Sequence, residues 1–388
     1  MAEIGSEFWE AADTGKKKYL ISGRAALEYI IRDILEEHSV DSVLMPSYCC
    51  YTMLEPFVRH GIKIRFYDIF YDEEKGLCAK LPEEDYTEVS KENHDNEIFY
   101  YMTFFGFSQL SGLDVKQIRD IYGLIIVDRT HSWLSDSTFQ VEIDADYTYI
   151  SFRKWTGFYG IAEAIKQHAP FVLELGTVGS EYSEHRKEAM MMKNDYIKWQ
   201  RTIEVDEHLS HATEIAEAEG QKKNYLNKYD EAEDFLDEHY VGNKPTTECV
   251  YQLLLADWNF VKGQRRTNAV VLLQGLRDIP EIKLMYGEQS EMDVPLFVPI
   301  LVKDDRDGLR RHLIDKQIYC PVHWPLSKYH QNISNQGKEI YNREISLVCD
   351  QRYTEEDMNR IVDAIKDFFD KKSVACEQVT NIRDYVCN

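Results

Sequence analysis

Two short apolar runs in the middle of the chain each end in a charged side chain. Leu124–Val127 ends in Asp128, and the run 147–152 is followed by Arg153 and Lys154. Runs of this length that are rich in branched or aromatic residues and bounded by polar ones are typical of buried strands. Open α/β sheets bind ligands at the carboxyl ends of their strands. The sequence therefore predicts a carboxylate and an amine at the ligand-binding edge of a sheet.

A lone lysine at the end of a strand is usually solvated, but Lys154 has suggestive neighbours. Ser151 precedes it by three residues, and His131 follows the strand-end carboxylate by three. If Phe152 and Trp155 desolvate the amine, it loses part of its preference for the ammonium form and becomes a nucleophile toward an aldehyde. The aldehyde cofactor that suits this arrangement is pyridoxal 5′-phosphate (PLP), whose ring nitrogen needs a carboxylate partner.

Five motifs extend this interpretation over nearly the whole chain. They are SGRAAL (22–27), LMPSYCC (44–50), IIVDRTHS (125–132), ISFRKW (150–155) and ISLVCDQRYTEEDMNRI (345–361). Taken in order, they resemble the fold-type-I PLP enzymes and, within them, the DegT/DnrJ/EryC1/StrS group of sugar aminotransferases. No single motif is specific, and the resemblance rests on their joint order and spacing. It implies an aspartate-aminotransferase-like α/β fold, with a mostly parallel central sheet in a large domain and a smaller C-terminal α/β domain.

The segment around Gly23 has the pattern of a helix start. Apolar residues follow it at helical spacing, namely Leu27, Ile30, Ile31 and Ile34. Ser22 can cap this helix, and the N–H groups of a first turn, together with the helix dipole, favour an anion. A plain capped helix fits these residues equally well. In the family, this loop holds the PLP phosphate through the positions that match Arg24 and Ala25. The position of Ser151 also anchors the phosphate. The family usually has a small hydroxyl residue in place of Arg24.

The resemblance also assigns residues around the cofactor ring. It makes Lys154 and Asp128 the catalytic pair, with Lys154 bound to PLP and Asp128 on the ring nitrogen. His131 matches a position usually held by Gln or His near the 3′ oxygen of the ring. Cys50 stands where many relatives carry an aromatic residue that stacks on the ring. Three nearby aromatic residues are alternatives for this stacking role: Tyr48, Tyr51 and Phe104.

Two further candidates lie in the C-terminal half. Asn243, in the break GNKP (242–245), is the nearest match to an asparagine that reaches the phosphate of the other subunit. It implies a homodimer with active sites at the interface, although a turn residue beside Pro245 is the alternative interpretation. His323 lies in a loop whose counterpart in the family faces the active site, and it is a candidate substrate contact.

The coarse organisation predicts two domains, a large PLP-binding domain over 1–260 and a small α/β domain over 261–388. Residues 180–240 are strongly polar and have a helical pattern. The apolar periodicity of 249–276 predicts one long helix. The small domain is expected to contain three strands, which are PLFVPILV (295–302), QIYCPVHW (317–324) and EISLVCD (344–350).

A net charge of −23 disfavours nucleic acids and anionic membrane surfaces as partners. Nowhere do 18 apolar residues run together, and the N-terminal segment has no apolar stretch of signal-peptide length. The eight cysteines show no metal-ligand spacing, and several lie in apolar runs, so no metal is expected. These patterns predict a cytoplasmic protein.

The resemblance implies an aminotransferase that moves an amino group from a small-molecule donor to a carbonyl acceptor. It suggests a keto-sugar attached to a nucleotide, used for surface polysaccharides or secondary metabolites, although no residue pattern reports a sugar. Another PLP reaction, such as that of a lyase, desulfurase or dehydratase, is an alternative. Lys154 argues against the sugar dehydratases of the family, which carry His there. A degenerate or regulatory PLP-binding protein is a further alternative, because Arg24, Cys50 and the sequence TGFYG (156–160) depart from the family pattern.

Overall fold

The computed structural model describes residues 14–83, 94, 96–107, 110–135, 143–203 and 211–386. The chain divides into two units, each assembled from two separate stretches. The first unit combines 1–39 with 145–256, and the second combines 40–144 with 257–388.

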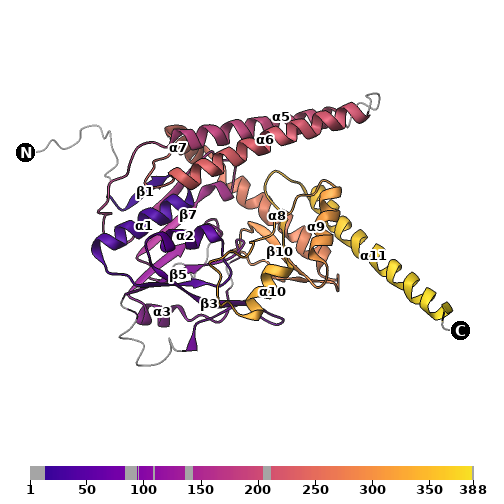
Figure 1. The fold of residues 1–388 in the computed structure, drawn as a ribbon, viewed down its shortest axis with the longest axis horizontal. Helices are drawn as coiled ribbons and strands as arrows, with labels where there is room; N and C mark the ends of the chain where they lie inside the picture. The colour runs from indigo at the N-terminus through magenta and orange to yellow at the C-terminus, as the bar shows by residue number, and fades with distance from the viewer. Residues whose placement is uncertain are drawn as a thin grey trace, which may run out of the picture. The chain divides into compact units, whose positions relative to one another are not determined.

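In the first unit, helix α1 covers a set of antiparallel strands (Figure 1). The strands pair in the order β1–β8–β7, and their bounds are Lys17–Leu20 for β1, Tyr147–Ser151 for β7 and Ala162–Lys166 for β8. Helix α1 spans Gly23–Glu37, and Ser22 caps it by accepting the N–H of Ala25. Its predicted apolar positions are all buried, at Leu27, Ile30, Ile31 and Ile34. The helix start and the apolar face predicted from the sequence are therefore confirmed.

A buried polar cluster joins α1 to β7 and β8. Asp33 is fully buried, and Lys166 Nζ donates to its Oδ2 at 2.8 Å. The Tyr147 hydroxyl donates to the same oxygen at 3.0 Å, and the Val172 N–H donates to Oδ1 at 2.8 Å. Glu37 also accepts from the Lys166 ammonium. Each charged group of the cluster has a hydrogen-bond partner, so removing one charge leaves another buried without compensation.

The variant Asp33→Ala should lower the free energy of unfolding by about 3–5 kcal/mol, because it leaves the Lys166 ammonium buried without its main partner. Chemical denaturation near pH 7 measures this loss. The variant Asp195→Ala is a matched control, since Asp195 lies exposed on α5, and it should stay within about 0.5 kcal/mol of the unmodified protein. Equal losses of stability in the two variants would contradict a structural role for this cluster.

The same cluster predicts how stability depends on pH. Burial opposes the Lys166 ammonium, but hydrogen bonds to Asp33 and Glu37 outweigh it and raise the pKa of Lys166 above its ordinary value of 10.5. For a base with a raised pKa, the contribution to stability is complete below the ordinary pKa and is lost as the pH rises through the raised one. The difference between the unmodified protein and Asp33→Ala should therefore shrink only above about pH 10.5.

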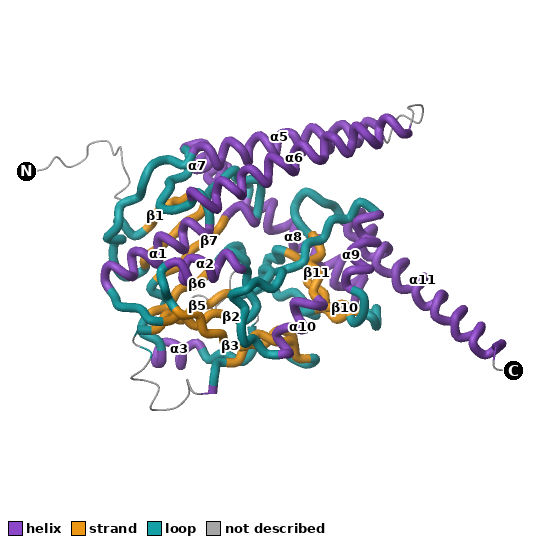
Figure 2. The backbone as a smooth tube through the Cα atoms, viewed as in Figure 1, coloured by secondary structure: helices purple, strands orange, loops and turns teal. Residues whose placement is uncertain are grey.

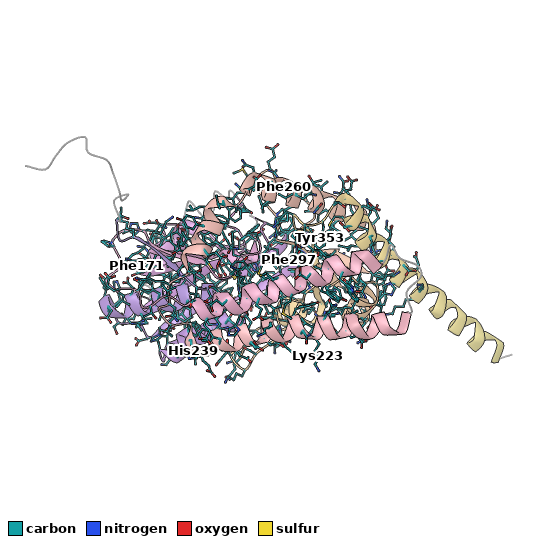
Figure 3. All side chains as sticks on the ribbon, turned by 90° about the horizontal axis from the view of Figure 1, so that it is seen from above. Phe171, Lys223, His239, Phe260, Phe297 and Tyr353 are labelled. Carbon is teal, nitrogen blue, oxygen red and sulfur yellow. The ribbon has the colours of Figure 1, made fainter. Side chains whose placement is uncertain are left out.

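A pair of long helices, α5 and α6, forms most of the rest of the first unit. Helix α5 spans Ser180–Ile203 and α6 spans His211–His239. They run alongside each other in Figure 1 and again in Figure 3, where the labels Lys223 and His239 mark α6. The predicted helical character of 180–240 is thus confirmed for the part of it that the structure describes.

The prediction of one continuous helix over 249–276 is wrong. Helix α7, Thr247–Leu255, ends before Ala256, and α8, Trp258–Leu276, begins after Asp257. Ala256 is extended, and Asp257 caps α8 by accepting the N–H of Phe260 at 3.0 Å. An aspartate that finds an N-cap bond stabilises a helix start, and the apolar periodicity does not register this break.

The second unit contains a mostly parallel set of strands in the order β6–β5–β2–β3–β4. The bounds are Ser42–Pro46 for β2, Lys63–Asp72 for β3, Gly76–Lys80 for β4, Glu97–Met102 for β5 and Leu124–Asp128 for β6. Only β4 is antiparallel, as the second strand of a hairpin with β3. Helices α2, Tyr51–Arg59, and α3, Val115–Ile121, connect parallel strands. The predicted α/β class and the βαβ unit are confirmed.

The C-terminal part of the second unit is a small antiparallel sheet with helices (Figure 2). The strands pair in the order β11–β10–β9, with bounds Ile282–Leu284 for β9, Phe297–Val302 for β10 and Glu344–Val348 for β11. The helices are α9, Arg306–Asp315, α10, Asn335–Arg343, and α11, Glu355–Val386. Helix α11 packs on α8 and α9.

The predicted strand over 317–324 is not formed. Ile318 and Cys320 are buried in alternation, which produces the strand-like pattern, but the segment is a loop. Pro321 has no N–H to donate to a ladder, and its carbonyl accepts a single bond from the N–H of Ser346 at 2.9 Å. In the part of the chain that the structure describes, no helix is long and apolar enough to cross a bilayer.

Candidate active site

In the first unit, the start of α1 lies against the end of β7. A Cβ placed on Gly23 would lie 2.8 Å from the Cβ of Ser151 and 3.3 Å from its Oγ, so only glycine fits there. The first turn of an α-helix directs N–H groups outward and carries the positive end of the dipole. A hydroxyl beside such a turn is a cradle suited to a phosphate group. The structure thus brings together Gly23 and Ser151, two of the predicted phosphate ligands.

The two residues after Gly23 have structural partners within the unit. The Ala25 N–H donates to Ser22 Oγ at 3.1 Å, which fixes the shape of the turn. The Arg24 guanidinium forms an ion pair with Asp237 and lies 5.4 Å from the centre of the Tyr240 ring. Arg24 therefore ties α1 to α6 by its side chain, in place of the small hydroxyl that the family usually carries.

Lys154 ends a short 3-10 helix, Phe152–Lys154, that follows β7 directly. Phe152 and Trp155 are buried, whereas the Lys154 side chain is exposed. The expected desolvation of the amine between these two rings is therefore not found, because the short helix places both rings in the core. Phe152 and Trp155 anchor the backbone on either side of Lys154 because both are buried. The Lys154 side chain is exposed, so a ligand could reach it.

An ion cluster beside Lys154 fixes the residue before it. Arg153 Nη1 donates to Glu233 Oε1 at 2.5 Å and to the Tyr182 hydroxyl at 2.8 Å. Burial disfavours the Glu233 carboxylate, but the charges of Arg153, Arg186 and Lys154 outweigh it and hold the pKa of Glu233 below its usual range. Sequence reasoning missed this cluster, because Glu233 lies on α6, far from Arg153 along the chain.

Asn243 lies beside the segment that leads into α1 of its own chain. Its backbone carbonyl accepts the N–H of Ile21 at 3.2 Å, and its Nδ2 donates to the His239 carbonyl at 2.6 Å. The side chain thus completes the end of α6, as the turn interpretation requires. Its role toward a second subunit stays a prediction.

In the second unit, Asp128 ends β6 and is buried. Its Oδ2 accepts from the Tyr100 hydroxyl at 2.9 Å, and its Oδ1 accepts from the Thr130 N–H at 2.7 Å. These two donors fix the orientation of the carboxylate. Tyr100 lies on the neighbouring strand β5, and sequence reasoning missed it because a strand interior full of aromatic residues gives no sign of which ring reaches the carboxylate.

His131 is buried close to the end of β6. Its Nδ1 accepts the N–H of Phe105 at 3.3 Å, so the neutral ring carries its proton on Nε2. This is the tautomer that can donate to a ligand oxygen. The Trp324 ring stacks on His131 at a centroid distance of 5.6 Å and an interplanar angle of 27°. Trp324 was not predicted as a stacking partner for the site.

Cys50 occupies the N-cap position of α2, and the Thr52 hydroxyl donates to its Sγ at 3.2 Å. Of the three aromatic alternatives, Tyr48 and Phe104 are fully buried and pack 5.5 Å apart, whereas Tyr51 is 39% exposed. Tyr48 also lies 5.2 Å from the Trp324 ring. An aromatic wall therefore lies next to His131, although Cys50 itself adds no ring to it.

His323 lies close to His131, with ring centres 6.1 Å apart. It is 7% exposed, and Phe297, labelled in Figure 3, packs on it at 4.9 Å. The His323 N–H donates to Glu344 Oε2 at 2.7 Å, and its Nδ1 lies 2.8 Å from Ser346 Oγ. The structure thus brings together two of the predicted histidines.

The comparison with family models gives one match. Residues 249–366 match the DegT/DnrJ/EryC1/StrS aminotransferase family. This confirms the resemblance for that part of the chain and includes the motif at 345–361, whereas the other four motifs lie outside the matched residues. A search of curated protein sequences found no match.

Solved structures share the fold over most of the chain. Spr1654 from Streptococcus pneumoniae in its PMP-form is 14% identical, with a TM-score of 0.60 over 93% of this chain and 88% of that one. Helicobacter pylori PseC, an aminotransferase involved in pseudoaminic acid biosynthesis, is 13% identical, with a TM-score of 0.57 over 92% and 87%. DesI, solved in the presence of its TDP-sugar product, is 12% identical, with a TM-score of 0.61 over 93% and 83%. The predicted fold class is confirmed.

Proposed function

We propose that this chain, whose residues 249–366 match the DegT/DnrJ/EryC1/StrS aminotransferase family, is a PLP-dependent aminotransferase. The observation that carries the proposal is the close approach of Gly23 to Ser151, which leaves no room for a Cβ on Gly23. Ser151 precedes Lys154 by three residues. A hydroxyl at a helix start fits a phosphate group, and a lysine at this distance along the chain fits the aldehyde of the same cofactor.

The proposed acceptor is the carbonyl group of a nucleotide-linked keto-sugar, and the donor is a small amine such as an amino acid. Two relatives support the sugar, because DesI was solved with a TDP-sugar product and PseC takes part in pseudoaminic acid biosynthesis. The proposed setting is the synthesis of surface polysaccharides or secondary metabolites in the cytoplasm.

The proposal gives each residue a task. PLP, when bound, supplies an aldehyde that condenses with amines and a ring that accepts electrons from the donor's α-carbon. Lys154 Nζ would hold the cofactor through its aldehyde and would also accept the proton that leaves the donor's α-carbon. Asp128 would accept a hydrogen bond from the ring nitrogen, and His131 Nε2 would donate one to the ring oxygen.

The remaining predicted residues bind the rest of the cofactor and the substrate. The backbone of Gly23, Arg24 and Ala25 holds the phosphate together with the Ser151 hydroxyl, and Asn243 approaches the phosphate of the partner subunit. Cys50 lies beside the ring, and His323 contacts the substrate. In this assignment, the proposed large domain, 1–260, binds the cofactor, and His323 belongs to the proposed small domain, 261–388.

A half-reaction tests the proposal. The protein is loaded with PLP and mixed with single amino acids, while the visible absorption of the lysine-bound cofactor is followed. At least one donor should bleach this absorption and leave one equivalent of pyridoxamine phosphate per site. Binding without conversion by any donor would favour the regulatory alternative. Release of an eliminated product without pyridoxamine phosphate would favour a lyase.

We propose further that the working unit is a homodimer. Helix α7 exposes three large side chains, at 59% for Tyr251, 70% for Leu254 and 83% for Leu255. Clustered apolar side chains on a surface mark contact sites, and two-fold dimers are the commonest soluble assembly. Light scattering should give about twice the chain mass of 45.6 kDa.

Two variants locate the proposed interface. The double variant Leu254→Asp, Leu255→Asp should shift the protein toward the monomer, because it places charges in an apolar contact. The variant Met191→Asp is the matched control, since Met191 on α5 is 57% exposed and should leave the dimer intact. A monomeric unmodified protein that still binds PLP would contradict the dimer.

A further inference from the structure

In the second unit, His323 is hydrogen-bonded to a series of buried polar side chains. Glu344 Oε2 accepts the backbone N–H of His323 at 2.7 Å, and the Ser346 hydroxyl donates to Glu344 Oε1. Ser346 Oγ lies 2.8 Å from His323 Nδ1. Glu344 and Ser346 are fully buried, and His323 is 7% exposed. The carboxylate is therefore linked to the imidazole ring through the serine hydroxyl.

Strand β11 builds this arrangement. Glu344 and Ser346 are two residues apart on a strand, so both point to the same face. Antiparallel pairing with β10 places Ser346 opposite Pro299. The Ser346 N–H also donates to the Pro321 carbonyl at 2.9 Å, which holds the loop that carries His323 against the strand. The three side chains are thus fixed by the register of a sheet.

With the His323 ring neutral, the protons of Glu344, Ser346 and His323 allow two arrangements. The Ser346 hydroxyl has one proton and can donate to only one neighbour at a time. When Glu344 is ionised, the hydroxyl donates to the carboxylate and the ring donates from Nδ1, so that Nε2 of the neutral ring is an acceptor. When Glu344 is protonated, it donates to Ser346, the hydroxyl donates to Nδ1, and the ring proton lies on Nε2.

We propose that Glu344, acting through Ser346, sets the ring tautomer of His323 and so decides whether Nε2 of this histidine is a donor or an acceptor. Glu344 is a positioning residue, because it acts on the ring through the Ser346 hydroxyl. The consequence for a substrate rests on the proposed function, in which His323 contacts the substrate. The tautomer itself depends on Glu344, Ser346 and His323 and not on a bound cofactor or substrate.

The electrostatic surroundings place the change near ordinary pH. Burial raises the pKa of Glu344 to about 8, and the smaller opposing effects are the Ser346 hydrogen bond, the His323 N–H and the charge of Arg306. The Arg306 guanidinium donates to the Glu344 carbonyl at 3.0 Å. The neighbouring ionisable groups include His131, whose ring centre lies 6.1 Å from that of His323. They also include Tyr48, Cys320 and Tyr341, and burial raises the pKa of each of these three.

Nuclear magnetic resonance of the full-length protein labelled with ¹⁵N-histidine tests the proposal directly. The Nδ1 and Nε2 signals of His323 are assigned by their loss in His323→Gln. As the pH rises through about 8, the ring proton should move from Nε2 to Nδ1. The change should be absent in Glu344→Gln, whose side chain cannot titrate. It should also be absent in Ser346→Ala, which lacks the hydroxyl that links Glu344 to His323. It should persist in Ser346→Thr, which keeps a hydroxyl.

A control separates this effect from general changes in charge. Asp350 is another buried carboxylate, just beyond β11, that pairs with Arg352, and Asp350→Asn should leave the His323 step unchanged. A step that survives in Ser346→Ala, or an unmodified protein without any step between about pH 7 and about pH 10, would overturn the proposal. The measurement needs neither PLP nor an amino donor, so its failure and the failure of the aminotransferase assignment are distinguishable.

Discussion

Replacing Lys154 with alanine should abolish covalent attachment of PLP and slow the donor half-reaction at least about a thousand-fold. Two contributions are lost together, the amine that binds the cofactor aldehyde and the base that moves the donor's α-proton. Proton transfer by a positioned side chain alone contributes roughly 10²–10⁴-fold. Because the Lys154 side chain is exposed, the variant should fold with a stability within about 0.5 kcal/mol of the unmodified protein.

The control for this prediction is Lys198→Ala. Lys198 lies on α5 in the same unit, its side chain is 68% exposed, and its Nζ lies 4.0 Å from a carboxylate oxygen of Asp195. It should bind and convert PLP as the unmodified protein does. Visible absorption and single-turnover kinetics compare the two variants. A Lys154→Ala protein that still forms the covalent complex would place the attachment elsewhere.

Replacing Asp128 with asparagine should weaken PLP binding roughly 10- to 100-fold, as expected for a hydrogen bond to a charged group worth about 1.5–3 kcal/mol. The half-reaction should fall by about 100-fold or more, because the ring nitrogen loses the negative partner that keeps it protonated. Asparagine keeps the shape of the side chain and can still accept the Thr130 N–H that now donates to Oδ1. Equilibrium PLP titration and single-turnover rates measure the two effects.

The matched control for Asp128 is Tyr100→Phe, which removes the hydroxyl that donates to Oδ2 but keeps the charge. It should cost much less than Asp128→Asn, because the carboxylate still faces the ring nitrogen. Equal losses in the two variants would mean that orientation, and not charge, is the contribution of this pair. Near-normal rates in Asp128→Asn would assign the ring nitrogen to another group.

Local features of the fold were predictable from the sequence. The start of α1 has a capping serine and a clear apolar face, and the strands that end at Asp128 and Ser151 are short apolar runs with polar borders. Such signals depend on neighbours in the chain. The break at Asp257 was missed because apolar residues continue in helical spacing on both sides of it. The loop at 317–324 was missed because its alternating burial imitates a strand.

The candidate site was predictable only in part. The nearness of Gly23 and Ser151 follows from a resemblance in the order of motifs, since the two residues lie far apart in the chain. The partners of the predicted residues gave no local signal, because Tyr100 and Ser346 reach Asp128 and His323 across separate strands and loops. One signal was present for Ser346, namely two polar residues in alternation in the apolar strand EISLV.

Borohydride trapping tests the central claim most directly. The protein is incubated with PLP, reduced, digested and mapped by mass spectrometry, so that any lysine joined to the cofactor carries a stable pyridoxyl mass. The account predicts one modified peptide, with the label on Lys154 and with none on Lys166 or Lys198. A label on another lysine, or no label at saturating PLP, would contradict the assignment of this chain as a PLP-dependent aminotransferase that uses Lys154.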